Sequence, residues 1–251
     1  MKKTLQEFFT RNNKIALGFS GGVDSSYLLY AALQNKADIM PYFVKSPFQP
    51  QFELDDAKRL AEDLKCGLKV IYLNHLDDGD IKANGAMRCY YCKKKIFMSI
   101  KNQAIADGYT VLIDGANASD DASDRPGMKA TSELEVKSPL RECGIDKAEV
   151  RRLSREAGLF TWDKPAYACL ATRIKTSVPI TAELLHKVEK SEVALFSLGY
   201  KDFRVRTDGE TAKIQVKEDQ IANIIAHREK IYEELKKYFN DVVLDLGKLK
   251  I

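Results

Sequence analysis

The sequence predicts an α/β fold, with a doubly wound parallel sheet followed by a smaller C-terminal α/β domain. Short apolar runs that suit buried strands begin at Lys14, Ala37, Lys69 and Val111. Between the second and third runs lies 53–64, in which leucine or alanine recurs at the spacing of one helix face. Strands that alternate with helices of this length form parallel βαβ units, which bind ligands at the carboxyl ends of their strands.

The loop after the first run has the composition of a phosphate site. Its sequence at 20–26 is Ser-Gly-Gly-Val-Asp-Ser-Ser, and a helical stretch follows at 27–33. The glycines let a ligand reach the backbone, and the N–H groups at the helix start lack intrahelical partners and lie at its positive end. The serines add hydroxyl donors, and the aspartate suits a helix cap or a ligand of Mg²⁺. We therefore expect phosphate contacts from Ser20, Gly21, Gly22, Asp24, Ser25 and Ser26.

Two alternatives compete with this interpretation of the loop. The loop lacks the Gly-Lys-Ser/Thr ending of a Walker loop, so it does not predict a γ-phosphate transferase of that class. An ordinary glycine turn with a serine cap is the other alternative, but each position of the loop has a reason to bind phosphate.

Length and charge set the broad class of the protein. The 251 residues suffice for two unequal parts, and we predict a phosphate-binding domain with a cysteine site at 1–178 and a small α/β domain at 179–251. Lysine and arginine number 40 against 36 for aspartate and glutamate, a net charge of +4 that suits acidic small molecules better than a nucleic-acid backbone. The sequence has neither a signal peptide nor a run of about 18 apolar residues, so we expect a cytoplasmic protein.

Cys89 and Cys92 stand three residues apart, at a spacing that puts both sulfur atoms on one side of a helical turn. Three lysines follow at once, and positive charge favours the thiolate, the form that binds metal or attacks sulfur. A redox pair, an iron–sulfur site and a structural zinc site are all open on this pattern. Zinc requires four ligands, and the chain has no second Cys-x-x-Cys or paired histidines.

The sequence pattern changes near residue 178. We predict a helix from Thr181 to Gly199, a hairpin formed by 202–206 and 211–216, a helix at 218–238 and a last strand at 242–246. Two arginines of the hairpin share a face because strand side chains alternate. They form either a clamp for phosphate or carboxylate or part of a solvated face; the two are Arg204 and Arg206.

The loop at 20–26 resembles the PP-loop of the adenine-nucleotide α-hydrolase families, whose Rossmann-like domains cleave ATP between its α- and β-phosphates and activate substrates by adenylylation. In such proteins the sheet edge after the second strand holds the adenine, so the resemblance makes Ser46 a nucleotide-contact candidate. A plain surface turn is the alternative for that residue.

Further motifs narrow the resemblance to the LarE family of ATP-dependent sulfur transferases. They are Asp114–Asn117, the Asp-Arg-Pro-Gly-Met-Lys run at 124–129, Val205–Arg206 and Leu244–Gly247, so the resemblance spans almost the whole chain. Cys169 falls at the family's reactive cysteine, which gives up its own sulfur in the best-known members. By the same resemblance, substrate or phosphate contacts are expected from Arg173, Arg204, Arg206, Lys129 and Glu133.

Cys89 and Cys92 depart from those best-known members. A branch of the family with three such cysteines is understood to hold a [4Fe-4S] cluster, in which one iron lacks a protein ligand and binds the sulfide to be transferred. Three thiolates and one open iron are chemically coherent. The resemblance therefore implies Cys89, Cys92 and Cys169 as catalytic residues and as cluster ligands, and we expect Cys66 and Cys143 to be structural.

The implied reaction is adenylylation of a carboxylate by ATP, followed by displacement of AMP by sulfide to give a thiocarboxylate. The implied substrate is pyridinium biscarboxylic acid mononucleotide, on the route to the nickel-pincer nucleotide. The cofactors expected are ATP, Mg²⁺ and a [4Fe-4S] cluster. The partners expected are the small-molecule nucleotide, sulfide or another sulfur donor, and further copies of the chain in a homo-oligomer, with no nucleic acid and no membrane.

Three other functions fit parts of the sequence. Some PP-loop tRNA thiolases use three cysteines and a cluster, but the modest charge and the lack of a recognisable RNA-binding module count against that activity. A nucleotide-binding iron–sulfur or zinc regulator without turnover belongs to a different class. An ammonia-using amidotransferase would leave the three cysteines unexplained.

Overall fold

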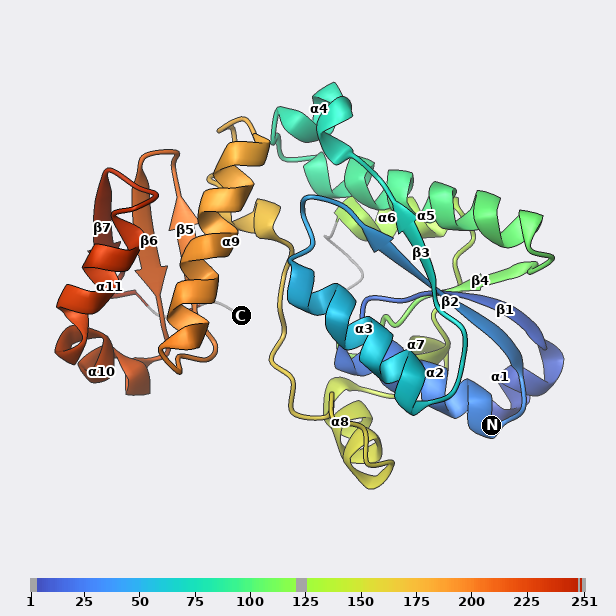
Figure 1. The fold of residues 1–251 in the computed structure, drawn as a ribbon. Helices are drawn as coiled ribbons and strands as arrows, with labels where there is room; N and C mark the ends of the chain where they lie inside the picture. The colour runs from blue at the N-terminus through green and yellow to red at the C-terminus, as the bar shows by residue number, and fades with distance from the viewer. Residues whose placement is uncertain (1–3, 121–125, 248, 250–251) are drawn as a thin grey trace. The chain divides into compact units, whose positions relative to one another are not determined.

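The computed structural model describes residues 4–120, 126–247 and 249 (Figure 1). The chain divides into two compact units. The first comprises Met1–Ser46, Gln51–Leu73 and Cys89–Lys164, and the second comprises Pro47–Pro50, Asn74–Arg88 and Pro165–Ile251. No helix within the described ranges combines the length and the apolar character that crossing a membrane requires.

The first unit is built on a four-stranded parallel sheet in the order β3-β2-β1-β4. Its strands are β1 (Lys14–Gly18), β2 (Asp38–Lys45), β3 (Lys69–Tyr72) and β4 (Val111–Ile113). β1 lies at the centre, with Ile15 opposite Ile39 of β2 on one side and Val111 of β4 on the other. The predicted α/β fold with a parallel sheet is therefore confirmed.

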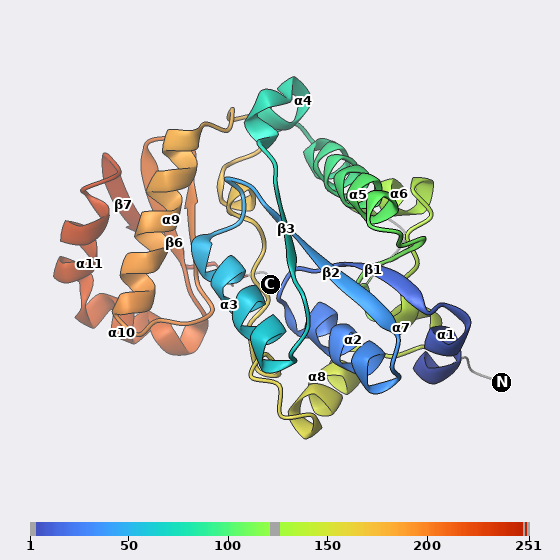
Figure 2. The same cartoon turned by 45° about the vertical axis from the view of Figure 1, so that its right-hand side comes forward.

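Helices cover both faces of this sheet (Figures 1 and 2). They are α1 (Leu5–Arg11), α2 (Val23–Gln34), α3 (Gln51–Asp63), α5 (Arg88–Ala106), α6 (Pro126–Glu133), α7 (Pro139–Glu142) and α8 (Lys147–Glu156). Strand side chains alternate between the faces, so Ile15 and Leu17 pack with α2 and α3, whereas Ala16 packs with α5 on the opposite face.

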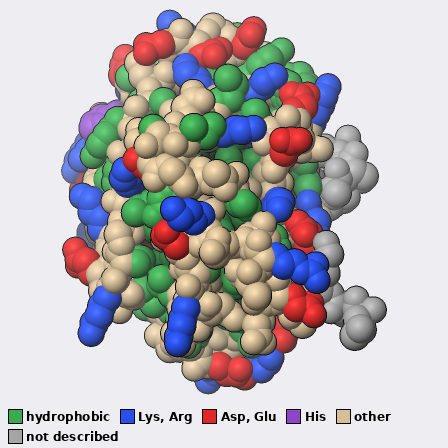
Figure 3. Space-filling model, turned by 90° about the vertical axis from the view of Figure 1, so that its right-hand side faces the viewer, with side chains coloured by type: hydrophobic (Ala, Val, Ile, Leu, Met, Phe, Trp, Pro, Cys, Tyr) green, Lys and Arg blue, Asp and Glu red, His purple; other side chains and the backbone are tan. Residues whose placement is uncertain are grey.

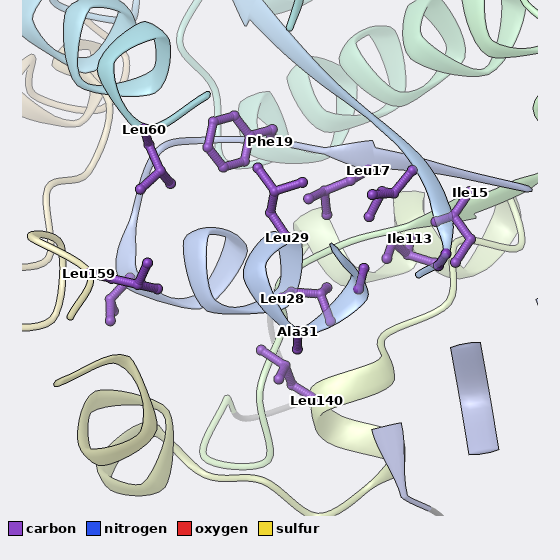
Figure 4. Packing of buried hydrophobic residues seen from close by; sticks show 14 of the residues in the cluster. Ile15, Leu17, Phe19, Leu28, Leu29, Ala31, Leu60, Ile113, Leu140 and Leu159 are labelled. Carbon is purple, nitrogen blue, oxygen red and sulfur yellow. The ribbon is translucent and has the colours of Figure 1, made fainter. Parts of the chain in front are cut away.

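The larger of the two cores lies between the sheet and α2 (Figure 4). Leu28 and Leu29 of α2 are fully buried there against Leu17 of β1, and Leu60 of α3 closes one side. Burial of a leucine or phenylalanine side chain contributes roughly 1.5–3 kcal/mol, so this cluster fixes α2 firmly on the sheet. The loop that precedes α2 is thereby held at the carboxyl end of β1.

The second unit contains the three-stranded sheet β5-β6-β7. β5 (Arg204–Thr207) and β6 (Thr211–Gln215) are antiparallel, which confirms the predicted hairpin, and Gly209 in their turn has a φ of +120°. β7 (Asp241–Leu244) runs parallel to β6. The unit also contains η1 (His75–Asp77), α4 (Gly79–Lys82), η2 (Leu170–Arg173), α9 (Ala182–Ser197), η3 (Glu218–Gln220), α10 (Ile221–Ala226) and α11 (Arg228–Leu235).

The prediction of one continuous helix at 218–238 is wrong. The chain there forms η3, α10 and α11, and the helix breaks at His227, whose φ and ψ of −102° and 14° are not helical. The Tyr200 hydroxyl lies 2.9 Å from His227 Nδ1 and donates to the Asn223 carbonyl at 3.0 Å. The Asn223 carbonyl also accepts the His227 N–H at 3.1 Å, so Tyr200 packs against the break without displacing that helical hydrogen bond. No local sequence pattern announces the break.

Candidate functional site

The loop between β1 and α2 has the backbone of an anion site. Gly21 has a φ of +69°, in the left-handed region that favours glycine, and a Cβ there would lie 3.4 Å from the Glu53 carbonyl oxygen. Gly22 is the N-cap of α2 and forms no side-chain cap. Asp24, which the sequence offered as a helix cap, lies instead in the first turn. Because glycine has no side chain, the cap residue offers no hydrogen-bond acceptor to the first N–H groups of α2.

The serines of the loop have three different environments. Ser20 is exposed, and its hydroxyl lies 3.1 Å from that of Ser25. Ser25 is buried and donates to the Gly22 carbonyl at 3.2 Å, so it braces the loop from within. Ser26 is fully buried, and its hydroxyl has no hydrogen-bond partner among the described residues. A buried hydroxyl without a partner costs free energy, and such costs are tolerated most often where a ligand or water completes the bond.

Asp24 is tied to two residues distant in sequence. Its carboxylate accepts a hydrogen bond from Asn117 Nδ2 at 3.2 Å and forms an ion pair with Lys147 Nζ. Lys147 is the first residue of α8, a helix that packs against α2 and has Asp146 as its cap. Lys147 could not be predicted from the sequence, because no local pattern shows that α8 begins beside the loop at 20–26.

The loop after β4 supports the start of α2. A Cβ on Gly115 would lie 2.9 Å from Ser25 N, so only glycine allows the two backbones to approach this closely. Asp114 is buried and accepts the Ser138 hydroxyl at 2.7 Å, which fixes this loop to the chain that follows α6. Asp124 and Arg125 of the run at 124–129 lie outside the described residues; Pro126 begins α6.

Ser46 follows the last residue of β2 and is 4% exposed. β1 and β2 are parallel neighbours, and Phe19 N donates to the Tyr42 carbonyl at 2.9 Å as β1 ends. Ser46 and the loop at 20–26 therefore leave the same edge of the sheet, as the strand pattern predicts.

Lys164 also reaches the phosphate loop. Its Nζ lies 2.6 Å from Asp56 Oδ2 of α3 and donates to the Gly21 carbonyl at 3.3 Å. The sequence shows Lys164 only as the residue before Pro165, and its position beside Gly21 depends on contacts with residues far away in the sequence.

Cys89 and Cys92 lie at the start of α5, one turn apart. Cys89 is exposed and Cys92 is half-buried. Between them, the Tyr90 hydroxyl donates to Glu133 Oε2 at 2.7 Å, and Lys94 Nζ pairs with the same oxygen at 3.2 Å. The two hydrogen bonds, with Tyr90 contributing more than Lys94, hold the pKa of Glu133 below its usual range.

Lys129 joins the same contact, since its Nζ lies 5.6 Å from the centre of the Tyr90 ring. Lys129 and Glu133 are both on α6, so the structure brings these two predicted residues to the turn that carries Cys89 and Cys92. The sequence did not predict this pairing of α5 with α6.

Cys169 belongs to the second unit, where it is the half-buried N-cap of η2. The backbone around it is held on both sides. Thr172 Oγ1 donates to the Cys169 carbonyl at 2.8 Å, and Leu170 N donates to the Phe48 carbonyl at 2.9 Å. The thiol therefore sits on a short segment whose main chain is fixed.

Arg173 is 1% exposed and forms an ion pair with Glu192 of α9 at 2.7 Å. The Tyr167 hydroxyl donates to the second oxygen of Glu192, and the Tyr167 ring lies 4.7 Å from the Arg173 guanidinium carbon. Val205 N also donates to Glu192, at 2.9 Å. Glu192, which sequence analysis missed, thus links the Cys169 segment to β5.

Arg204 and Arg206 differ in their surroundings. Arg204 is buried and donates at 2.6 Å to each of two backbone carbonyls, those of Phe203 and Ala166. Burial, reinforced by the neighbouring Arg173, lowers the pKa of Arg204. Arg206 is exposed, donates to Gln215 at 2.7 Å and reaches the Thr172 carbonyl at 3.4 Å. Both arginines therefore contact the segment on either side of Cys169, and Arg206 is the one that solvent reaches.

The structure assigns the predicted residues to two sets. The loop residues, Ser46, Cys89, Cys92, Lys129 and Glu133 belong to the first unit, and Cys169, Arg173, Arg204 and Arg206 belong to the second. Among the described residues, no three His, Cys, Asp or Glu side chains are grouped as a metal-binding cluster. The five cysteines, all within the described ranges, form no disulfide, and burial raises the pKa of the Cys66 thiol.

Three curated proteins are similar to this chain over most of its length. An uncharacterized protein of Synechocystis is 35% identical over 227 residues, which are 89% of this chain and 84% of that protein. An uncharacterized protein of Methanocaldococcus jannaschii is 32% identical over 98% of this chain and 94% of its own length.

No known family model matches the chain. The pyridinium-3,5-bisthiocarboxylic acid mononucleotide synthase of Lactiplantibacillus plantarum is 31% identical over 249 residues, which are 98% of this chain and 90% of that enzyme. Identity at this level over nearly the full length of both proteins establishes common descent, and with it the resemblance that the motifs indicated: the chain belongs to the LarE family.

Proposed function

We propose that this protein is an ATP-dependent sulfur transferase that converts a carboxylate of pyridinium biscarboxylic acid mononucleotide into a thiocarboxylate. The observation that carries the proposal is the similarity over 98% of the chain to an enzyme named for the bisthiocarboxylic acid product. The loop at 20–26 supports the ATP-dependent part, because it joins an open helix start, an exposed Ser20 and a buried Ser26 hydroxyl that has no partner among the described residues.

In the proposed first step, a carboxylate oxygen of the substrate attacks the α-phosphorus of ATP. The bond from that phosphorus to the bridging oxygen breaks, and pyrophosphate leaves with the electron pair. The loop N–H groups and Ser20 would bind the phosphates, and Asp24 would supply an oxygen ligand to the Mg²⁺ that accompanies ATP. The product is an acyl adenylate, in which AMP is a good leaving group.

In the proposed second step, sulfide attacks the acyl carbon, and AMP leaves with the electrons of the broken C–O bond. Cys89, Cys92 and Cys169 would hold a [4Fe-4S] cluster, whose fourth iron supplies a binding site for sulfide. Two thiols on one helical turn, those of Cys89 and Cys92, support this part of the proposal. Three thiolates would leave one corner of such a cluster without a protein ligand.

Exposed cations near the cysteines would bind the substrate. Lys129 and Arg206 are exposed cations next to the cysteine-bearing segments, and either can pair with the phosphate or the free carboxylate of the nucleotide. Arg173 and Arg204 are buried against protein groups, so their role in the proposal is to hold the Cys169 segment in place.

The test is an anaerobic incubation of the reconstituted protein with ATP, Mg²⁺, sulfide and pyridinium biscarboxylic acid mononucleotide. We expect AMP, pyrophosphate and a product in which sulfur replaces oxygen, detected by mass spectrometry. A reaction without ATP is the control. Formation of AMP without any thiocarboxylate would overturn the sulfur-transfer step, and the absence of both products would overturn the whole proposal.

A further inference from the structure

Lys164 is a cation held at the backbone of the phosphate loop. Its side chain is 15% exposed, and its Nζ contacts the Gly21 carbonyl at 3.3 Å and the Asp56 carboxylate at 2.6 Å. Gly21 is the residue whose left-handed backbone turns the chain into α2. An ammonium group there adds a mobile positive charge to the partial positive charge at the start of α2.

The position of Lys164 is built from two directions. Arg151 of α8 donates to the carbonyls of Trp162 and Lys164, at 2.7 and 2.9 Å, and so fixes the main chain at this residue. Asp56 of α3 orients the side chain. All four residues belong to the first unit, as does the loop.

The contacts of Lys164 suit a residue that changes partners. The lysine stem has four methylene groups and its ammonium donates in three directions, so it can keep the Gly21 carbonyl while it exchanges Asp56 for another anion. Lys147 differs, because its partner Asp24 is itself a residue of the loop and is also held by Asn117. Lys164 can therefore turn from Asp56 toward an anion bound on the loop without breaking a side-chain contact of the loop itself.

We propose that Lys164 binds the β- and γ-phosphates of ATP and stabilises the pyrophosphate that leaves during adenylylation. This inference rests on the proposed function. In the step concerned, the bond between the α-phosphorus and the bridging oxygen breaks and negative charge builds on the departing pyrophosphate. The ammonium of Lys164 leaves Asp56 to contact that charge, and no proton is transferred.

The buried Ser26 hydroxyl is a separate indication that the loop is completed by a ligand. It lies in the first turn of α2, and it has no hydrogen-bond partner among the described residues. An anion on the loop N–H groups would be within the reach of a lysine already bonded to Gly21.

The experiment is calorimetric titration of the full chain with Mg²⁺-ATP, Mg²⁺-pyrophosphate and AMP, for the wild type and three variants. Lys164→Met should weaken ATP and pyrophosphate binding about tenfold or more, the loss expected for one charge-assisted contact, and leave AMP binding unchanged. Asp56→Asn should strengthen pyrophosphate binding, because it releases Lys164 from its competing partner. Lys58→Met is the control: it removes an exposed lysine from α3, the helix that carries Asp56, and should change none of the three affinities.

The two substitutions separate phosphate binding from a structural role. If Lys164 only joins α3 to the loop, Lys164→Met and Asp56→Asn will weaken all three ligands alike and lower the unfolding temperature together, which would overturn the inference. Equal affinity for ATP in the wild type and in Lys164→Met would also overturn the inference about Lys164. That result would leave the proposed function standing. A wild type that binds ATP but forms no AMP with the pyridinium substrate would instead overturn the proposed function.

Discussion

The Tyr90 hydroxyl donates a hydrogen bond to Glu133 Oε2 at 2.7 Å and thereby joins the cysteine-bearing turn of α5 to α6. Lys94 adds an ion pair to the same carboxylate, and Lys129 approaches the ring of Tyr90. Two residues that the family resemblance assigned to the substrate thus lie beside the two cysteines. Because Tyr90 and Lys94 both bond the Glu133 carboxylate, the ionised form of Glu133 helps to hold this turn of α5 against α6.

The titration of Glu133 provides the first prediction. Its pKa is lower in the folded chain than in the unfolded chain, so its contacts stabilise the fold above the ordinary carboxyl pKa, and this contribution is lost as pH falls through the folded pKa. Tyr90→Phe should move the pKa of Glu133 back up toward its usual value. Carbon-detected NMR titration of the labelled carboxyl group measures the shift.

Glu149 is the matched control for that titration, because Arg152 lowers its pKa at a surface site that lacks Tyr90. The pKa of Glu149 should be the same in the wild type and in Tyr90→Phe. An unchanged pKa of Glu133 in the variant would show that the hydrogen bond is not formed in solution.

The second prediction concerns the buried ion pair of Arg173 and Glu192. Both side chains are 1% exposed, so Glu192→Ala would leave a guanidinium buried without its partner. Breaking a buried pair in this way costs about 3–5 kcal/mol, and we expect urea denaturation to show a loss of that size in the free energy of unfolding. Glu183→Ala, which removes an exposed ion pair from the same helix, should shift the midpoint little. Equal urea midpoints for Glu192→Ala and Glu183→Ala would contradict the prediction that Arg173 and Glu192 form a buried ion pair.

The third prediction tests the close approach at Gly115. Gly115→Ala would place a methyl group 2.9 Å from Ser25 N, and the neighbouring atoms are backbone atoms that cannot turn aside. The loop or α2 must shift, at a cost of about 1–3 kcal/mol in the free energy of unfolding. ATP binding should weaken in parallel, as measured by calorimetry.

Gly85→Ala is the control for this substitution, because a Cβ at Gly85 meets nothing within 4 Å. It should leave both stability and ATP binding near the wild-type values. Full ATP affinity in Gly115→Ala would show that the loop after β4 does not support the phosphate loop.

The fourth prediction concerns the cysteines and iron. After strictly anaerobic reconstitution, the wild type should hold about four irons per chain, as one [4Fe-4S] cluster requires. Cys169→Ala, Cys89→Ala and Cys92→Ala should each lower the iron and acid-labile sulfide content. Iron and sulfide analysis with the visible absorption spectrum provides the readout.

Cys66→Ala should retain the full iron content, because burial raises the pKa of this thiol and disfavours the thiolate that binds metal. If the wild type held no iron after reconstitution, Cys169 would instead be expected to give up its own sulfur, as the resemblance also allows. Cys89 and Cys92 would then be a redox pair or a zinc site.

Local pattern was enough to predict the strands and the strand–loop–helix arrangement around 20–26. Period and composition located β1 to β4, and the threonine and glycine at the ends of 181–199 located α9, because the causes of these elements lie within a few residues of one another. The mixture of acidic and basic side chains on the face shown in Figure 3 agrees with the small net charge.

The missed residues have their causes elsewhere in the chain. Lys147 bonds Asp24 from the start of α8, Lys164 bonds the Gly21 carbonyl, and Tyr200 contacts the break at His227 from outside that helical stretch. Alternation along β5 correctly put two arginines on one face, but the burial of Arg204 depends on the Ala166 carbonyl and on Tyr167. Contacts between segments so far apart leave no periodic signal in the sequence.

The second unit is assembled from three separate stretches of chain, and this limits how the protein can be cut or recombined. Asn84 donates to the carbonyls of Lys175 and Val178, each at 2.9 Å, and Arg88 donates to that of Ala171. A fragment that begins at Pro165 would lack these donors, and a chimera with a single junction would take them from the wrong parent. Exchange of this unit between relatives therefore requires that 47–50 and 74–88 are grafted together with 165–251. The segment that carries Cys169 can be transferred intact only with these residues from earlier in the chain.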